Sequence, residues 1–231
     1  MDLHINYDHI SGNITSKQWY IKGSLHDKNS LIKLEVYISN NLVHTKYFKN
    51  GKLHKDFDEP ASIHYNNGKI VLQQWYKEGK HHRDNEPALI DYNFQTGLVE
   101  YKCWYMEGKY YRIDDLPTKE IYYESGKLKN QVWLTENGYP YRINDSPSSI
   151  SFYESGNKKE EFWFNKEGKQ HRENKYSNIL YDEDGKITKQ AWFKDGVEVK
   201  EEVKLIEIKI DNKCPHCKCD IKLTYTIAKE E

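Results

Sequence analysis

The sequence has no long hydrophobic run. No stretch approaches the roughly 18 apolar residues that a membrane-spanning helix needs, so we expect no membrane-spanning segment and no membrane partner. The first twenty residues include Asp2, His4 and Asp8 instead of a basic start followed by an apolar stretch, so no signal peptide is visible. These two absences favour an intracellular, cytoplasmic protein.

The chain also lacks an excess of either charge and has few apolar residues. Its 35 Lys and Arg are matched by 36 Asp and Glu, which leaves a net charge of -1 and no overall field to draw the protein onto nucleic acid. Hydrophobic residues make up 37% of the 231 residues, which is too few for a thick globular core.

Common catalytic motifs are missing. There is no P-loop, no dinucleotide-binding fingerprint, no His-Glu-x-x-His and no Gly-x-Ser-x-Gly. A catalytic site is a singular arrangement of side chains, whereas the His, Arg and Asp positions of this chain recur at intervals. An enzyme is therefore the class of function that we favour least.

Aromatic residues are abundant and regularly spaced. They make up 14% of the chain, far above the content of a disordered sequence. All thirteen glycines fall at two recurring positions and all six tryptophans at a third, which indicates an internal repeat. The aromatic anchors, spaced by 28 to 30 residues, are Trp19, Tyr47, Trp75, Trp104, Trp133, Trp163 and Trp192.

Each repeat reads as two strands and two turns. Around Trp75, a turn at Gly68 precedes an extended run, and Lys77 to Lys80 forms a tight turn before a second alternating run from Pro87 to Tyr92. Asn40 replaces the turn glycine once, and asparagine tolerates a left-handed backbone better than other side chains.

The repeats predict the fold class and the division of the chain. We expect an all-β protein, an elongated antiparallel meander of stacked β-hairpin repeats with about six and a half units over residues 1–198. A small C-terminal β and cysteine tail, residues 199–231, follows the array.

The units resemble a known repeat. Most contain an aromatic pair followed by x-x-Gly-Lys, and several contain a Tyr-x-x-Gly turn, at Tyr65 to Gly68, Tyr123 to Gly126 and Tyr153 to Gly156. On these motifs, residues 5 to about 198 resemble the MORN repeat (membrane occupation and recognition nexus), in the longer variant of antitoxin-like bacterial proteins, phages and giant viruses. The resemblance implies a type of repeat, not an activity, and it adds a viral particle or host cytoplasm to the expected locations.

The tryptophans lie in phase with the more polar side chains of their strands, which leaves two interpretations open. In the first, each indole covers the neighbouring hairpin and forms a second, thin core, as is usual for a residue that is well buried on average. In the second, the row is a platform that stacks a sugar, a peptide or a single-stranded nucleic acid. The candidate ligand-binding residues are Trp19, Trp75, Trp104, Trp133, Trp163 and Trp192.

A second ladder consists of His or Tyr followed by a cation and then by acids. Its members are His54-Lys55, His82-Arg83, Tyr111-Arg112, Tyr141-Arg142 and His171-Arg172. We expect the cations and carboxylates to pair locally or between adjacent units and to fix the turn before the proline. Exposed pairs of this kind contribute only about 0–1 kcal/mol each.

The tail carries the one motif that does not recur. Cys214, His216, Cys217 and Cys219 offer metal ligands within six residues, and a Cys-x-x-Cys turn can point both sulfurs at one ion. A structural zinc takes four ligands, so we weigh three alternatives: a zinc shared by Cys214 and Cys217 of two chains, a site closed within one chain, and free thiols in a reducing compartment.

The sequence therefore favours a non-catalytic scaffold that mediates protein–protein interaction through a partner of unknown identity. A carbohydrate- or single-stranded nucleic-acid-binding module that uses the tryptophan row is the alternative. Structural zinc and a homodimer formed through the tail are further expectations.

Overall fold

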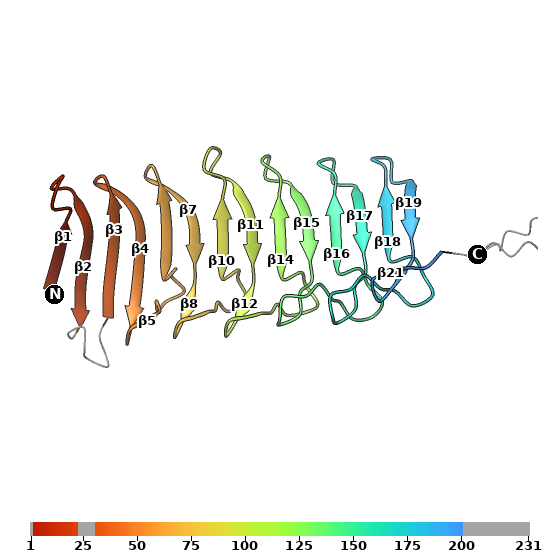
Figure 1. The fold of residues 1–231 in the computed structure, drawn as a ribbon, viewed down its shortest axis with the longest axis horizontal. Coiled ribbons are helices and arrows are strands. Elements are labelled where there is room, and N and C mark those ends of the chain that lie inside the picture. Colours follow the sequence, from red (N-terminus) through yellow and green to blue (C-terminus); the bar gives the residue numbers. More distant parts are fainter. Residues whose placement is uncertain (1, 23–30, 201–231) are drawn as a thin grey trace, which may run out of the picture. The chain divides into compact units, whose positions relative to one another are not determined.

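The computed structural model describes residues 2–22 and 31–200 (Figure 1). The chain divides into two compact units, Met1–Glu198 and Val199–Glu231. The fold of the first unit follows. The candidate metal ligands of the tail lie outside the described residues.

The first unit is all-β, which confirms the fold class that the repeats predict. Its main sheet has fifteen strands, and neighbouring strands follow one another in chain order and pair antiparallel (Figure 1). The strands of the main sheet are β1 (Asp2–Tyr7), β2 (Ile14–Lys22), β3 (Leu31–Ile38), β4 (Asn41–Lys49), β5 (Lys52–Leu53), β6 (Ser62–Asn66), β7 (Lys69–Gln74), β10 (Leu89–Tyr92), β11 (Val99–Cys103), β14 (Lys119–Tyr122), β15 (Leu128–Val132), β16 (Ser149–Phe152), β17 (Lys158–Phe162), β18 (Asn178–Tyr181) and β19 (Ile187–Ala191). Among the described residues, no helix is long and apolar enough to cross a bilayer.

The two kinds of turn play different parts. The turns at one end join neighbouring strands of the sheet directly. At the other end, from Trp75 onward, the anchor lies outside the sheet strands, and the tight turn after it does not join two strands of the main sheet. The small hairpins pair β8 (Tyr76–Lys77) with β9 (Lys80–His81), β12 (Tyr105–Met106) with β13 (Lys109–Tyr110), and β20 (Phe193–Lys194) with β21 (Val197–Glu198). In two further units a single bridge, Leu134 to Pro140 or Phe164 to Gln170, takes their place.

The separate hairpins have a local cause in the segment that follows each of them. After β9, the segment from His82 to Ala88 contains a left-handed residue, Asn85, which interrupts an extended strand. Pro87 then lies two residues before β10 and has no N–H to give to a ladder. The chain can therefore rejoin the sheet only at Leu89.

Conformation at the predicted turns matches the sequence pattern. Gly108 has a φ of +83°, and Asn40, which takes the place of a turn glycine, has a φ of +64°. A Cβ at Gly108 would meet the Cβ of Lys80 at 3.6 Å, an ordinary contact, so a side chain fits there and the backbone conformation is the obstacle.

Gly108→Val is expected to lower the free energy of unfolding by more than about 1 kcal/mol, because a β-branched residue is a strained outlier at positive φ. Urea denaturation measures the change. Gly108→Asn is the matched control, since asparagine accepts this backbone conformation and should cost clearly less. An unchanged midpoint for the valine variant would refute the role assigned to this turn.

The core is a thin row along one end of the sheet. Trp75, Trp104, Trp133 and Trp163 are buried, with 5–7% of their surface exposed. The backbone N–H of each of these anchors donates to the carbonyl of a small buried residue immediately before the next sheet strand, at 2.8–3.0 Å. These small residues are Ala88, Thr118, Ser148 and Ser177.

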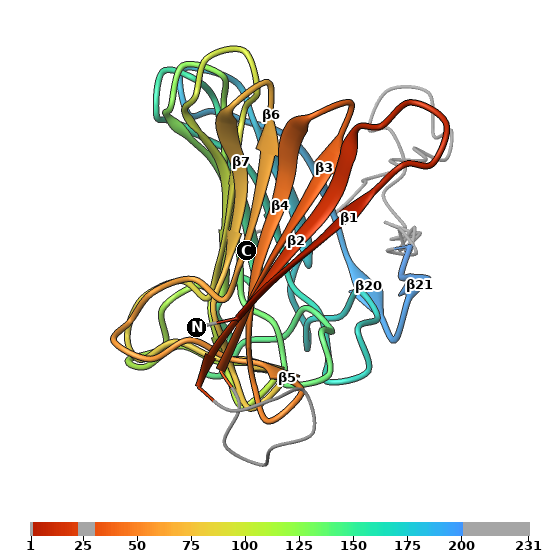
Figure 2. The same cartoon turned by 90° about the vertical axis from the view of Figure 1, so that its left-hand side faces the viewer.

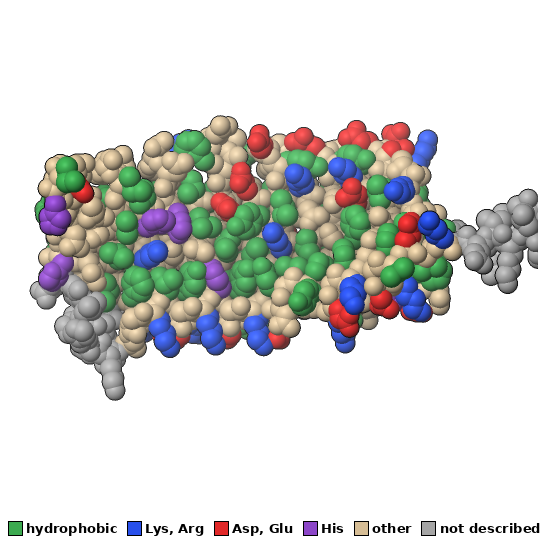
Figure 3. Space-filling view, viewed as in Figure 1, with side chains coloured by type: hydrophobic (Ala, Val, Ile, Leu, Met, Phe, Trp, Pro, Cys, Tyr) green, Lys and Arg blue, Asp and Glu red, His purple; other side chains and the backbone are tan. Residues whose placement is uncertain are grey.

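At the opposite end, tyrosines link the turns. The hydroxyl of Tyr123 donates to the carbonyl of Phe152, and that of Tyr153 donates to the carbonyl of Tyr181, both at 2.7 Å. The tyrosine in these two Tyr-x-x-Gly turns therefore bonds the next hairpin. Figure 2 shows the sheet of this unit as one layer above its loops, and Figure 3 shows hydrophobic side chains gathered in a band across one face.

Candidate binding site

Five loops lie at the same end of the sheet as the small hairpins (Figure 1). The turns that join neighbouring strands of the sheet directly lie at the other end. We call the five loops the loop edge. They comprise residues 54–60, 82–88, 111–117, 141–147 and 171–177. Each begins with His or Tyr followed by Lys or Arg, so the second ladder of the sequence forms this edge.

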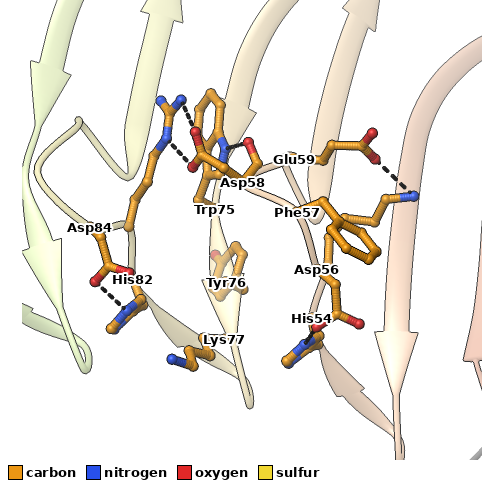
Figure 4. A pocket seen from close by; sticks show the side chains of 12 residues that line it. His54, Asp56, Phe57, Asp58, Glu59, Trp75, Tyr76, Lys77, His82 and Asp84 are labelled. Atoms are coloured by element: carbon orange, nitrogen blue, oxygen red, sulfur yellow. Dashed lines mark hydrogen bonds and ion pairs between the residues drawn. The ribbon is translucent and has the colours of Figure 1, made fainter.

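Neighbouring units are clamped together at the loop edge by an Asp, a Trp and an Arg. The indole N–H of Trp75 donates to the main-chain carbonyl of Asp58 at 3.0 Å. Arg83 Nε and Nη2 donate to the two carboxylate oxygens of the same Asp58 at 2.6 and 2.8 Å (Figure 4). The Arg83 guanidinium also lies 4.0 Å from the centre of the Trp75 ring. The hydrogen bonds from Arg83 lower the pKa of the Asp58 carboxyl.

The same clamp recurs twice along the array. Its indole-to-carbonyl distances are 2.7 and 3.0 Å, and its guanidinium-to-ring distances are 4.0 and 4.1 Å. The two further clamps are Asp115–Trp133–Arg142 and Asp145–Trp163–Arg172. The ladder was predicted to pair its cations and carboxylates locally or between adjacent units, and in these three clamps the pairs join adjacent units.

The histidines of the ladder form a second link between units. His54 Nδ1 accepts a hydrogen bond from the backbone N–H of Glu78 in the next unit at 3.2 Å. His54 Nε2 lies 2.9 Å from Asp56 in its own loop. His54 Nδ1 also lies 3.1 Å from the carboxylate of Glu78. His82 and His171 receive the equivalent backbone N–H at 3.3 and 3.1 Å.

The clamp is absent after two of the five loops. The segments from His82 to Pro87 and from His171 to Tyr176 are one residue shorter than the three equivalent segments, and neither has a counterpart of Asp58. After the second of them, the indole N–H of Trp192 donates to the carbonyl of Arg172 at 2.8 Å. After the loop 82–88, the indole N–H of Trp104 consequently has no hydrogen-bond partner among the described residues, although Trp104 is only 5% exposed. Arg112 still lies over the Trp104 ring, at 3.7 Å, but donates to Glu120 at 3.0 Å instead of to the preceding loop.

The structure places most of the predicted tryptophan row in the core. Trp75, Trp104, Trp133 and Trp163 are buried, while Trp19 and Trp192 are half-buried. An arginine guanidinium covers each of the four buried rings at 3.7–4.1 Å. A ligand that stacked on these rings would have to displace the guanidinium, so the arrangement favours the core interpretation over a platform.

The predicted metal ligands are not described. Cys214, His216, Cys217 and Cys219 lie outside the described residues, so the zinc and homodimer predictions stay predictions. Within residues 2–22 and 31–200, no group of three His, Cys, Asp or Glu side chains could hold a metal ion. Cys103 is buried, and burial raises the pKa of its thiol to about 11.

Shallow hollows recur between successive units of the loop edge. One of about 270 Å³ lies between the loops 54–60 and 82–88, and its lining includes Asp58, Trp75 and Asp84 (Figure 4). Another, of about 290 Å³, is lined in part by Ile32 and Tyr47. Two more, of about 350 and 450 Å³, lie beside Trp133 and Trp163. Since related hollows repeat along the edge, none of them stands out as a unique catalytic cavity.

Phe57 breaks the repeat. It is 96% exposed, has a φ of +64°, and lines the two hollows of about 270 and 290 Å³. Every other loop has a left-handed Asn or Asp at this place: Asn85, Asp114, Asn144 and Asn174. An aromatic residue is disfavoured both by this backbone conformation and by exposure to water. Sequence reasoning missed Phe57, although an alignment of the five loops shows the substitution.

A scan against models of protein families finds none that matches this chain, and a search of curated proteins finds no match.

Proposed function

We propose that the protein is a non-catalytic scaffold of MORN-type repeats that binds a protein partner through its loop edge, with Phe57 as the apolar anchor. The observation that carries the proposal is a fully exposed aromatic side chain on a left-handed backbone, at a place where the four equivalent loops have Asn or Asp. Strain of this kind persists at sites where it serves a function, and it costs on the order of 1–3 kcal/mol.

A partner would relieve the unfavourable exposure. Burying a Phe side chain is worth about 1.5–3 kcal/mol, and aromatic residues are frequent anchors of protein interfaces. Phe57 stands between two hollows that could receive neighbouring side chains of the partner. The clamp that Asp58 forms with Trp75 and Arg83 holds the loop in place before binding, which reduces the entropy lost on association.

Phe57→Asn is expected to abolish capture of the partner while leaving the fold intact. Tagged full-length protein is exposed to a pool of proteins from its source cell and of co-encoded proteins, and bound proteins are quantified by mass spectrometry. We expect at least a tenfold loss of the captured partner, because burial of the ring is worth more than about 1.4 kcal/mol.

The variant and its control separate binding from folding. Asn is the residue that three other loops carry at this place, so Phe57→Asn should match or exceed the thermal stability of the wild type. Ile10→Asn is the control, because Ile10 is 98% exposed but lies in the turn between β1 and β2, at the opposite end of the strands. A partner that Phe57→Asn retains, or that Ile10→Asn loses equally, would contradict the proposal.

A further inference from the structure

Charge is distributed unevenly along the loop edge. The loops 54–60, 82–88 and 111–117 carry seven Asp and Glu against three Lys and Arg. The loops 141–147 and 171–177 carry two acidic residues against three basic ones. The acidic part, which we call the acidic loops, contains Phe57. A partner that docks on Phe57 therefore meets more carboxylates than cations on these three loops, although the whole chain is nearly neutral.

Exposure strengthens this asymmetry. The side chains of Arg83 and Arg112 are only 15% and 19% exposed, because each lies against a tryptophan ring and donates to a carboxylate. The carboxylates are far more open, with 60% of Asp58 and 76% of Asp84 exposed. Asp114 is also exposed and pairs with no cation among the described residues. An incoming ligand thus contacts acidic oxygens before the covered guanidiniums.

The repeat spacing restricts the conformation of the ligand. Each unit adds two strands to the sheet, so equivalent points of successive loops lie about 9.6 Å apart at about 4.8 Å per strand. A peptide in the polyproline II conformation advances about 9.3 Å in three residues and presents every third side chain on the same side. A β-strand alternates its side chains with period two, so every third side chain points to the opposite face from the one before it.

The hollows on the two sides of Phe57 differ in chemistry. The hollow shared with the loop 82–88 is lined by four carboxylates and three cations, so acidic groups are in slight excess (Figure 4). They are Asp56, Asp58, Glu59 and Asp84, and Lys55, Lys77 and Arg83. The hollow toward β3 and β4 includes Ile32 and Phe48. The first suits a cationic side chain, and the second suits an apolar one.

From these observations we propose that the partner contributes an extended basic segment in the polyproline II conformation, which lies across the acidic loops and places a Lys or Arg at every third residue. An apolar residue of the same segment packs against Phe57. This inference rests on the proposed scaffold function and names the chemistry of its partner. The exposed carboxylates disfavour a nucleic-acid strand at the same place.

The test uses synthetic peptides and the full-length protein. A fluorescein-labelled peptide of three Lys-Pro-Pro repeats is titrated and followed by fluorescence anisotropy. The first control has the same composition with its three lysines in succession, and the second has Glu in place of Lys. We expect the spaced lysine peptide to bind at least fivefold more tightly than the clustered one, and the glutamate peptide not to bind.

Variants locate the site. Asp84→Asn combined with Asp114→Asn is expected to weaken binding of the spaced peptide at least threefold, and added salt should weaken it further. Asp114→Asn installs the residue that three of the other four loops carry at this place, so it should not disturb the loop. Glu124→Gln, an exposed change in a turn at the opposite end of the strands, is the control and should leave affinity unchanged.

Each contrary result overturns a defined part of the proposal. Equal affinity for the spaced and clustered peptides would overturn the threefold spacing, and full affinity in the Asp84 and Asp114 double variant would overturn the site. If no lysine peptide binds while capture through Phe57 persists, the partner chemistry is wrong and the scaffold function stands. If Phe57-dependent capture is absent, the scaffold function itself fails. Preference for a single-stranded RNA over the peptide would also overturn the inference.

Discussion

Trp133→Ala is expected to lower the free energy of unfolding by about 3–5 kcal/mol, as is typical for loss of a buried aromatic side chain. Trp133 is 7% exposed, and its indole N–H donates to the carbonyl of Asp115 at 2.7 Å. The Arg142 guanidinium lies 4.0 Å from the centre of the ring. The substitution therefore removes a buried ring and a hydrogen bond between two neighbouring units at once.

A pair of phenylalanine variants isolates the hydrogen bond. Trp133→Phe loses the bond to Asp115, whereas Trp104→Phe removes an indole N–H that has no partner. The first should therefore cost about 1 kcal/mol more than the second. Denaturant titration of the three variants measures these differences, and acrylamide quenching of the wild type should report shielded indoles. A Trp133→Ala protein of wild-type stability with lost ligand binding would instead favour the stacking platform.

Insertion of an aspartate between Asn85 and Glu86 is expected to raise the free energy of unfolding by about 1–3 kcal/mol. The insertion gives this loop the length of its neighbours and supplies the residue that corresponds to Asp58. Its carbonyl can accept the buried N–H of Trp104, which at present lacks a partner. A buried polar group left unsatisfied costs about 1–3 kcal/mol, and its satisfaction recovers that cost.

Insertion of an asparagine at the same place serves as the control. Asparagine brings the carbonyl and tolerates the left-handed backbone, but it has no carboxylate to pair with Arg112. The asparagine insertion should thus give most of the stabilisation, and the aspartate insertion should add up to about 1 kcal/mol more. If both insertions lower the melting temperature, the short loop is not a missing clamp.

The sequence was sufficient to predict the parts of the fold that depend on local conformation. Gly108 and Asn40 lie at left-handed turns as their spacing predicts, because backbone conformation is a property of single residues. Partner choice across units was harder to predict. Arg83 bonds Asp58, 25 residues earlier, and not Asp84 beside it, because the Trp75 ring and the returning loop bring the distant carboxylate within reach.

The candidate site is found by comparing the residues at equivalent positions of the five loops, which the repeat period alone does not reveal. A repeat analysis finds what the units share, whereas Phe57 is informative because it differs from Asn85 and its equivalents. No local sequence pattern indicates that the Phe57 side chain is exposed. The MORN-type assignment and the partner are proposals, because the motifs that the repeats share describe how the array is built and not what it binds.

The links between units have a consequence for synthesis. Clamps and histidine contacts join residues separated by about one repeat of 28–30 residues, so each unit needs only its predecessor in order to dock. A chain growing at about 5–20 residues per second adds one repeat in roughly 1–6 seconds, while a β-hairpin forms in about 1–10 microseconds. Each hairpin can therefore settle on the previous one long before the next has left the ribosome, and the nascent protein grows by addition at one end.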